Sequence, residues 1–576
     1  MNLGKIVDRV GDTNPQLFRE LKERLTLRNL GIAIVASLLV QVLTFLYFSG
    51  QIPVAVPDVV SIERSNSIDR PTAERRFKVN ENTYSKYCSF SSNDGYTALC
   101  QLDGNGNFKV NWQIWRSDIF NSLSWILSFG LILGAVYTLV ADLVREEKRG
   151  TLNFIRLSPQ SAPTIFIGKV LGIPILVYLA AALMLPLHLG FGLSLSASPA
   201  LLVSWYLTIC ATWWLFASTA VLYVLLGGVQ AIVTTIAMAF PLGVPLLVTN
   251  AYLGGTINHE SWLGKSSDRI SWFGLPITSS AVWIYIFSTC SFAIASYWVW
   301  QALERRYLNP TATAIGKRQS YFINLCLQLW VGGFTLPLIF AQPANYLTTR
   351  QLISGLAIGD FMALLLSIFM LLPSKQALQD WSRHRREHTN RGRKFWQRDL
   401  VRDLISNDKS PALLTIAINI GMAMAVWLPA AVFGLTKVSN SMSFNGWSAP
   451  GYGLKLATGV CLAATLILIY ATIAHLGLFL KVKKQHVWIV GIVGIVAISP
   501  LGIAYVLSMA RVPSDLLEIV VLFSPFAPMT LFQVSTGAIL ATLVAQIAVF
   551  ATLARQLQRK LQISGRSQSQ ELLARS

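Results

Sequence analysis

Few residues of this chain have the types and spacing that catalysis or metal binding requires. The nearest approach to a phosphate-binding loop is Gly264-Lys265-Ser266, but His259 stands where the first glycine of GxxxxGK[ST] belongs. The sequence contains no HExxH, no GxSxG and no cysteine or histidine cluster with zinc spacing. We therefore predict that the chain is not an enzyme, binds no cofactor or metal and hydrolyses no nucleotide itself.

Ionisable residues are also rare within the long apolar runs of the chain. Asp360 in LAIGDFMALLL is the clearest, and His188 and His475 are two others. A carboxylate in such a run lines an ion pathway or pairs with a cation, so Asp360 is the candidate intramembrane polar site. The alternative is that Asp360 lies near an outer membrane interface. The two histidines are expected to be hydrogen-bonded core residues.

The most organised polar segment is REEKRGTLNFIRLSPQSAPTIFIGK, residues 145–169, which separates two apolar runs. We expect a helix that Gly150 breaks, a short helix that Pro159 ends, and a third helix capped by Ser161. Lys169 is expected to extend its amine toward the membrane surface. The segment therefore predicts a short helix pinned between two longer ones.

This short helix is expected to carry an apolar ridge among charged side chains. The ridge consists of Leu152, Phe154, Ile155 and Leu157, and the charged frame of Glu146, Glu147, Lys148, Arg149 and Arg156. A short apolar helical ridge suits the groove of a protein partner. We therefore predict a docking surface for a cytoplasmic protein.

The composition indicates an integral membrane protein. The chain has 576 residues, of which 53% are hydrophobic and 13% charged, and a mean hydropathy of +0.52. Apolar runs long enough to cross a hydrocarbon core of about 30 Å recur along the chain. They lie near 30–49, 119–143, 166–190, 200–226, 229–253, 276–303, 321–341, 352–373, 411–434, 453–480, 487–508 and 530–554. Their length and continuous apolarity predict an all-α polytopic membrane protein with about 12 transmembrane helices.

The formal net charge of +20 is distributed in a way that predicts topology. If the N-terminus is cytoplasmic, 33 of the 47 Lys and Arg belong to the inner side and 14 to the outer side. Eight of those 14 lie in the loop 51–118, which is too long to obey the positive-inside rule. We therefore expect both termini in the cytoplasm. The basic residues, densest at 383–398, are expected to meet lipid head groups rather than nucleic acid.

The runs predict a 6+6 organisation. A cytoplasmic segment lies between the second and third helix of each half, which suggests a degenerate internal repeat. The expected parts are an N-terminus with an elbow helix (1–29), a first six-helix domain (30–303), a linker (304–320), a second six-helix domain (321–554) and a tail (555–576). The notable loops are 51–118 outside, and 144–165 and 374–410 inside.

Two segments outside the runs carry their own predictions. Asn14 and Pro15 begin an amphipathic helix whose basic and leucine faces suit the membrane surface. The loop 51–118 is expected to form short strands and turns, with Cys88 and Cys100 as a disulfide or, alternatively, as two free thiols. The other four cysteines lie in apolar runs and are expected to be free.

Small residues and prolines predict how some helices pack. The pairs Gly130-x-x-x-Gly134 and Gly168-x-x-x-Gly172 predict close helix contacts. Pro174 is one of several candidate kinks.

The polar segment resembles the coupling loop of ABC-2 type permeases, the membrane subunits of bacterial ABC exporters. The resemblance is carried by E-x-x-x-G-T-L, then Pro, Ser and Gly-Lys, which here are Glu146, Gly150, Thr151, Leu152, Pro159, Ser161, Gly168 and Lys169. It extends over about 14–303, where an elbow helix, a large outer loop and a polar outer segment before the sixth run match the family. The resemblance implies a permease subunit in the bacterial inner membrane, driven by a separate ABC ATPase subunit that docks on this loop.

The second half departs from the family pattern. Its corresponding loop has Asp408-Lys409-Ser410-Pro411 but no Gly-Thr-Leu and no Gly-Lys. It is either a diverged permease half or an added membrane domain, in which case a second permease copy would complete the pore. A secondary transporter with 12 spans, or a non-transport scaffold that recruits partners through 374–410, is the alternative function.

Overall fold

The structure is a computed structural model that describes most of the chain. The described residues are 11–52, 86–87, 90–91, 99–100, 109–228, 230–231, 235, 250, 253, 270–340, 346–388, 398–434, 452–482, 485–531 and 534–564. By their packing, the residues fall into two compact units. Unit 1 comprises Met1–Lys265 with Ser279–Trp300, and unit 2 comprises Ser266–Thr278 with Gln301–Ser576.

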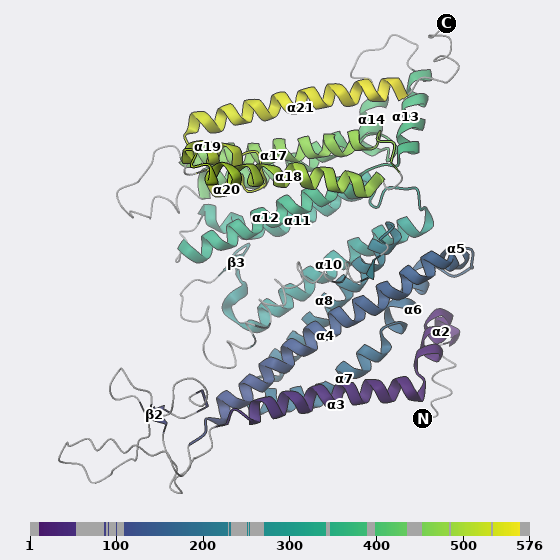
Figure 1. The fold of residues 1–576 in the computed structure, drawn as a ribbon, viewed down its shortest axis with the longest axis vertical. Helices are drawn as coiled ribbons and strands as arrows, with labels where there is room; N and C mark the ends of the chain where they lie inside the picture. The colour runs from purple at the N-terminus through teal and green to yellow at the C-terminus, as the bar shows by residue number, and fades with distance from the viewer. Residues whose placement is uncertain are drawn as a thin grey trace, which may run out of the picture. The chain divides into compact units, whose positions relative to one another are not determined.

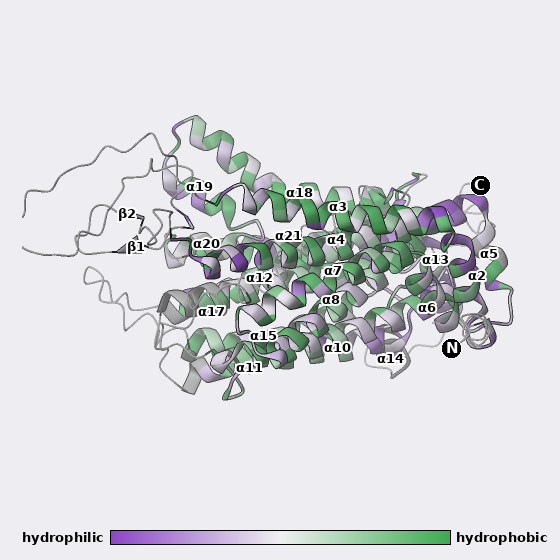
Figure 2. Ribbon diagram, turned by 90° about the horizontal axis from the view of Figure 1, so that it is seen from below, coloured by the Kyte–Doolittle hydropathy of each residue, from purple (hydrophilic) through white to green (hydrophobic). Residues whose placement is uncertain are grey.

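Ten helices of the described part of the chain are long and apolar enough to cross a membrane. In unit 1 they are α3 (Leu27–Ser49), α4 (Trp112–Arg149), α7 (Ile175–Ser194), α8 (Pro199–Leu225) and most of α10 (Ala281–Leu308). In unit 2 they are α12 (Tyr346–Met370), α15 (Leu413–Pro429), α17 (Tyr452–Gly477), α18 (Gln485–Met509) and α21 (Thr536–Ser564). These helices are hydrophobic along most of their length (Figure 2). The chain is thus an all-α, multi-pass membrane protein.

Two of the twelve predicted runs are absent from these ten. The run at 229–253 falls mostly outside the described residues. The run at 321–341 forms the helix α11 (Lys317–Phe340), which carries the polar residues Asn324 and Gln328 on one face.

The third predicted run is divided in two at Pro174. The helix α6 (Ala162–Gly172) ends there and α7 begins, because proline has no N–H to give to the carbonyl of Val170. The hydroxyl of Tyr178 donates to that carbonyl instead, at 2.7 Å. Pro174 therefore breaks the helix, as its sequence position predicts.

Unit 1 is built around α4. One stripe of α4 is fully buried, including Phe120, Leu123, Ile132 and Leu139, and it packs against α7 and α8. The helix α3 lies along α7 (Figure 1), where Ser37 donates to the carbonyl of Ala180. The short helix α2 (Pro15–Arg24) lies against α6.

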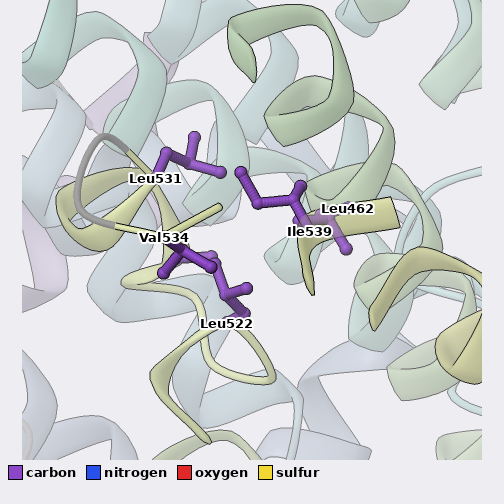
Figure 3. Packing of buried hydrophobic residues seen from close by; sticks show 6 residues of the cluster. Leu462, Leu522, Leu531, Val534 and Ile539 are labelled. Carbon is purple, nitrogen blue, oxygen red and sulfur yellow. The ribbon is translucent and has the colours of Figure 1, made fainter. Parts of the chain in front are cut away.

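Unit 2 is built around α17, which packs against α21, α15, α18 and α12. Figure 3 shows its best-defined apolar cluster, where α17 meets the chain before and within α21. The cluster contains Leu462, Leu522, Ala527, Leu531, Val534 and Ile539. The short helices α19 (Ser514–Val521) and α20 (Ala527–Thr530) lead into it.

Strands are confined to two short hairpins among the described residues. In the predicted outer loop, β1 (Phe90–Ser91) pairs with β2 (Leu99–Cys100). In unit 2, β3 (Ser271–Trp272) pairs with β4 (Leu275–Pro276), and the indole of Trp272 donates to the carbonyl of Trp330 on α11. The predicted disulfide lies outside the described residues, because Cys88 and the side chain of Cys100 are not described. Cys210, Cys290, Cys326 and Cys461 are free thiols.

Candidate functional site

The long helix α4 supplies the base of the site. It has 38 residues, which at 1.5 Å per residue gives about 57 Å, well beyond the hydrocarbon thickness of about 30 Å. Gly150 ends it in the left-handed conformation (φ 74°), and its N–H donates to the carbonyls of Glu146 and Glu147. The predicted break at Gly150 is thus confirmed.

A short helix follows at once. It is α5 (Thr151–Arg156), and the Thr151 hydroxyl fixes its start by donating to the Glu146 carbonyl at 3.1 Å. After a turn at Ser158, Ser161 caps α6: its hydroxyl accepts from the N–H of Thr164. The sequence of helix, break, short helix, break and helix is therefore as predicted.

The surface of α5 and its flanks is largely open. Leu157 is 85% exposed, Ile155 is half-buried, and Glu147, Thr151 and Pro159 are exposed. The side chains of Leu152 and Phe154 lie outside the described residues, so only their backbone can be placed, within α5. Single exposed leucines are common, but one at the end of a short helix held between two breaks suits recognition by a partner.

The prediction that Lys169 extends its amine to the membrane surface is wrong. Its side chain is fully buried, and its Nζ lies 2.6 Å from both carboxylate oxygens of Glu146. The cause is the proximity of the α4 end to α6: a carboxylate within reach binds the amine more tightly than the interface would. The pair joins the two helices on either side of α5 and so fixes where α5 is held.

The helix α2 packs onto α6 through the second predicted glycine pair. A Cβ on Gly168 would lie 2.8 Å from Asn14 Oδ1, and a Cβ on Gly172 would lie 2.5 Å from the Cβ of Glu20. Asn14 caps α2 by accepting from the N–H of Leu17, and its amide donates to the carbonyl of Thr164 on α6. The absence of side chains at the two glycines is what lets the helix backbones approach so closely. In the first pair, Gly134 packs on Val177 while Gly130 faces open space.

The face of α2 that contacts α6 is its polar one. Gln16 and Glu20 are buried, whereas Leu25 is 46% exposed. Of the predicted leucine face, Leu17 and Leu21 are half-buried, with the Leu17 side chain against Gly172 of α6, and Leu25 remains available to a membrane surface. The polar contact is ordered by Gln16, whose amide donates to Glu20 at 2.8 Å.

Around Lys169 the charges form a connected cluster. Glu20 lies 3.7 Å from Lys169 and 3.4 Å from Arg24, and Arg24 binds Asp142 on α4 at 2.8 Å. Burial raises the pKa of Glu20, and the like charges of Asp142 and Glu146 add to this, against the opposing effect of Lys169 and Arg24. Three carboxylates and two cations thus share one partly buried space.

Three carboxylates this close could in principle ligate a metal ion, because oxygens of Glu20, Asp142 and Glu146 lie within 4.8 Å of one another. Here the amine of Lys169 and the guanidinium of Arg24 already occupy those oxygens. The cluster is therefore a structural joint among α2, α4 and α6. Glu20 and Asp142 carry no site motif in the sequence, and the one local signal for them is the spacing of four between Glu20 and Arg24.

Unit 2 has a comparable joint near its predicted inner loop. Lys317, the first residue of α11, is 1% exposed, and its Nζ donates to Ser410 Oγ at 2.6 Å and to the carbonyls of Leu404 and Pro411. Asp408 accepts from the N–H of Lys317 and from Arg305. The helix α14 (Arg398–Ser406) is held here, and α13 (Lys375–His388) packs on α21.

Asp360 lies 14 residues from the Tyr346 end of α12 and ten from the Met370 end, about 21 Å and about 15 Å along the helix, and is 3% exposed. This places it inside the helix rather than at an end. The two histidines are hydrogen-bonded core residues, as predicted. His188 contacts Ser124 and Tyr206, and His475 contacts the N–H of Ala412.

No family model, no curated protein and no solved structure matches the chain. Its fold and site define a multi-pass helical membrane protein with a short helix held beyond the end of a long one. Any more specific assignment rests on the residues of that site.

Proposed function

We propose that the chain is the permease subunit of an ABC exporter of the ABC-2 type, powered by a separate ATPase subunit. The observation that carries the proposal is the placement of α5. It follows a helix about 57 Å long, it lies between Gly150 and the Ser161 cap of α6, and the Glu146–Lys169 pair joins the two helices that flank it. A short helix held rigidly at both ends can transmit a displacement, whereas one on a loose loop cannot.

The mechanism follows from this placement. ATP binding draws the two nucleotide-binding subunits together, and a subunit docked on α5 pulls that helix with it. Because α4, α6 and α2 meet in one charge cluster, the displacement reaches α3, α4 and α7 as rigid elements. The membrane helices then alternate between inward and outward access. The chemical step belongs to the ATPase, and this chain turns its movement into transport.

The topology proposed with this function puts α5, both termini and the 374–410 segment in the cytoplasm of a bacterial cell, with the helices in its inner membrane. It is supported by the charge distribution of 33 Lys and Arg on that side. The two six-helix halves act together in this proposal, with the second as a diverged permease half.

Co-purification tests the proposal. A tagged chain is isolated from its native membranes, and bound proteins are identified by mass spectrometry and ATPase assay. Leu157→Asp, at the exposed end of the α5 ridge, is expected to lose at least 90% of an ATPase subunit that the unmodified chain retains. Gly150→Pro combined with Leu152→Asp should abolish the association, because it also breaks the junction with α4.

Leu308→Asp is the matched control, since Leu308 is a leucine at a helix end with 76% exposure. It should retain the ATPase at the level of the unmodified chain. If no ATPase co-purifies with the unmodified chain, the ABC assignment is wrong and a secondary transporter takes its place. If Leu157→Asp and Leu308→Asp retain the subunit equally, α5 is not the docking element.

A further inference from the structure

A row of buried polar side chains crosses the interior of unit 2. Ser320, Asn324 and Gln328 follow one another at intervals of four along α11, so they lie on one face of that helix. The side-chain amide of Asn419 on α15 donates to Ser320 Oγ, and the side-chain amide of Asn324 donates to the main-chain carbonyl of Asn419. All four side chains are at most 5% exposed.

The row ends at Asp360. The amide of Gln328 donates to Asp360 Oδ1 at 2.7 Å, and the indole of Trp427 donates to Oδ2 at 2.7 Å. No ion pair of Asp360 exists among the described residues, and no described charge acts on its carboxylate. A carboxylate that neutral donors alone hold in an apolar interior is costly, which favours the uptake of a positive charge at this site.

The helices around Asp360 supply no such charge of their own. Of the helices that α12 contacts, α15 has no ionisable side chain, α11 has Lys317, Arg318, Tyr321 and Cys326, and α17 has Tyr452, Lys455, Cys461, Tyr470 and His475. The basic groups among them with described partners bind elsewhere. Lys317 binds Ser410, Lys455 binds the carbonyl of Val534, and His475 binds the N–H of Ala412. On α12 itself, Arg350 lies ten residues away, about 15 Å along the helix.

The groups around the Asp360 carboxylate favour a proton over a metal cation. Metal cations of the hard type take several oxygen ligands. Both oxygens of Asp360 instead face N–H donors, which repel a metal ion but leave room for a proton. The Gln328 Oε1 is buried and has no hydrogen-bond partner, and neither has Asn419 Oδ1. Buried acceptors without a partner are rare and require an explanation.

We propose that Asp360 is a proton-binding site, reached along the Ser320–Asn324–Gln328 row from the Lys317 end of α11. A proton from water forms an O–H bond at one carboxylate oxygen and returns to water when that bond breaks. Turning the Gln328 amide presents Oε1 to the new O–H, which gives this acceptor its partner. A water molecule that enters the row would give Asn419 Oδ1 a partner and would carry the proton. The second half of the chain thus contains a proton-linked element, independent of the docking of any ATPase.

Infrared difference spectroscopy of the full chain in lipid nanodiscs tests the site across a pH series. A protonated buried carboxyl gives a C=O stretching band that ionised carboxylates lack. The band should be present at low pH, be lost at high pH, and be missing at every pH in Asp360→Asn. Asp380→Asn, at an exposed carboxylate of α13, is the control and should keep the band.

Gln328→Met keeps the test decisive if Asp360→Asn does not fold. It removes one donor that favours the ionised carboxylate, so the band should persist to higher pH. Asn324→Leu should slow deuterium exchange of the band at least tenfold, because it interrupts the row. A band that survives in Asp360→Asn, or no titrating band in the unmodified chain, overturns the site. Unchanged exchange in Asn324→Leu overturns the route.

Discussion

At the scale of single residues, the ion pair of Lys169 with Glu146 is the contact on which the position of α5 depends most. Lys169 is fully buried, and both of its short contacts are to Glu146. Removing one member of a buried pair leaves the other charge uncompensated, which costs about 3–5 kcal/mol. Glu146→Gln is therefore expected to lower the free energy of unfolding by about that amount, measured by thermal denaturation in detergent.

The adjacent Glu147 provides the comparison for this change. Its side chain is exposed and has no ion pair among the described residues, so Glu147→Gln should stay within about 0.5 kcal/mol of the unmodified chain. Equal melting temperatures for Glu146→Gln and Glu147→Gln would show that Lys169 finds sufficient compensation elsewhere.

The raised pKa of Glu20 predicts how the stability of the folded chain changes with pH. Its pKa in the folded chain is raised above the ordinary 4.5, with burial as the main cause. A raised pKa means that its contribution to stability is fully present below the unfolded pKa of about 4.5 and is lost as pH rises through the folded pKa. Glu20→Gln removes this dependence, so the variant should gain stability relative to the unmodified chain as pH rises. Melting curves of Glu20→Gln and of the unmodified chain from pH 4 to about 8 test this prediction. If the variant instead loses stability relative to the unmodified chain as the pH rises, the prediction is wrong.

At the scale of elements, the docking of α2 on α6 depends on two missing side chains. A side chain at Gly172 would meet Glu20, whereas one at Gly130 would meet nothing within 4 Å. Gly172→Leu should therefore release α2 and increase the rate of tryptic cleavage at Arg24 at least fivefold, as followed by gel or mass spectrometry. Gly130→Leu carries the same substitution in another membrane helix and should leave the cleavage rate unchanged. Similar rates in both variants would show that α2 is not held by this contact.

Local signals made most of these elements predictable from the sequence. Gly150 ends α4 and Ser161 caps α6 because each acts through the backbone within a few residues. The partners of Lys169 were not predictable in the same way. Glu146 is 23 residues away and Glu20 is 149, so their contact depends on how α2, α4 and α6 pack. The row of polar residues on α11 was not predicted. The length and average apolarity of the run at 321–341 do not show that its few polar residues share one face of the helix.

At the scale of the whole molecule, both units fasten the same kind of junction with a buried lysine. In unit 1, Lys169 on α6 binds acidic groups of α4 and α2. In unit 2, Lys317 on α11 binds the segment from Leu404 to Pro411, just before α15. Lys169 lies on the third predicted span of its half, whereas Lys317 lies at the start of the first predicted span of the other half. Each lysine connects the inner loop of its unit to the first helix of that unit, which is α2 in unit 1 and α11 in unit 2. The two junctions share a buried lysine and an inner loop but differ in the lysine's partners, which are carboxylates in unit 1 and a hydroxyl with main-chain carbonyls in unit 2.

If the second half is a diverged permease half, one chain supplies both halves of the transporter. Native mass spectrometry of the complex should then find one 63.5 kDa chain with two ATPase subunits. The alternative, in which unit 2 is an added domain and the first units pair, requires two chains with two ATPase subunits. Because the two outcomes differ by a whole chain, the mass decides between them without any assumption about the substrate. A complex with two chains would contradict the repeat and would leave the two buried-lysine junctions as a coincidence of packing.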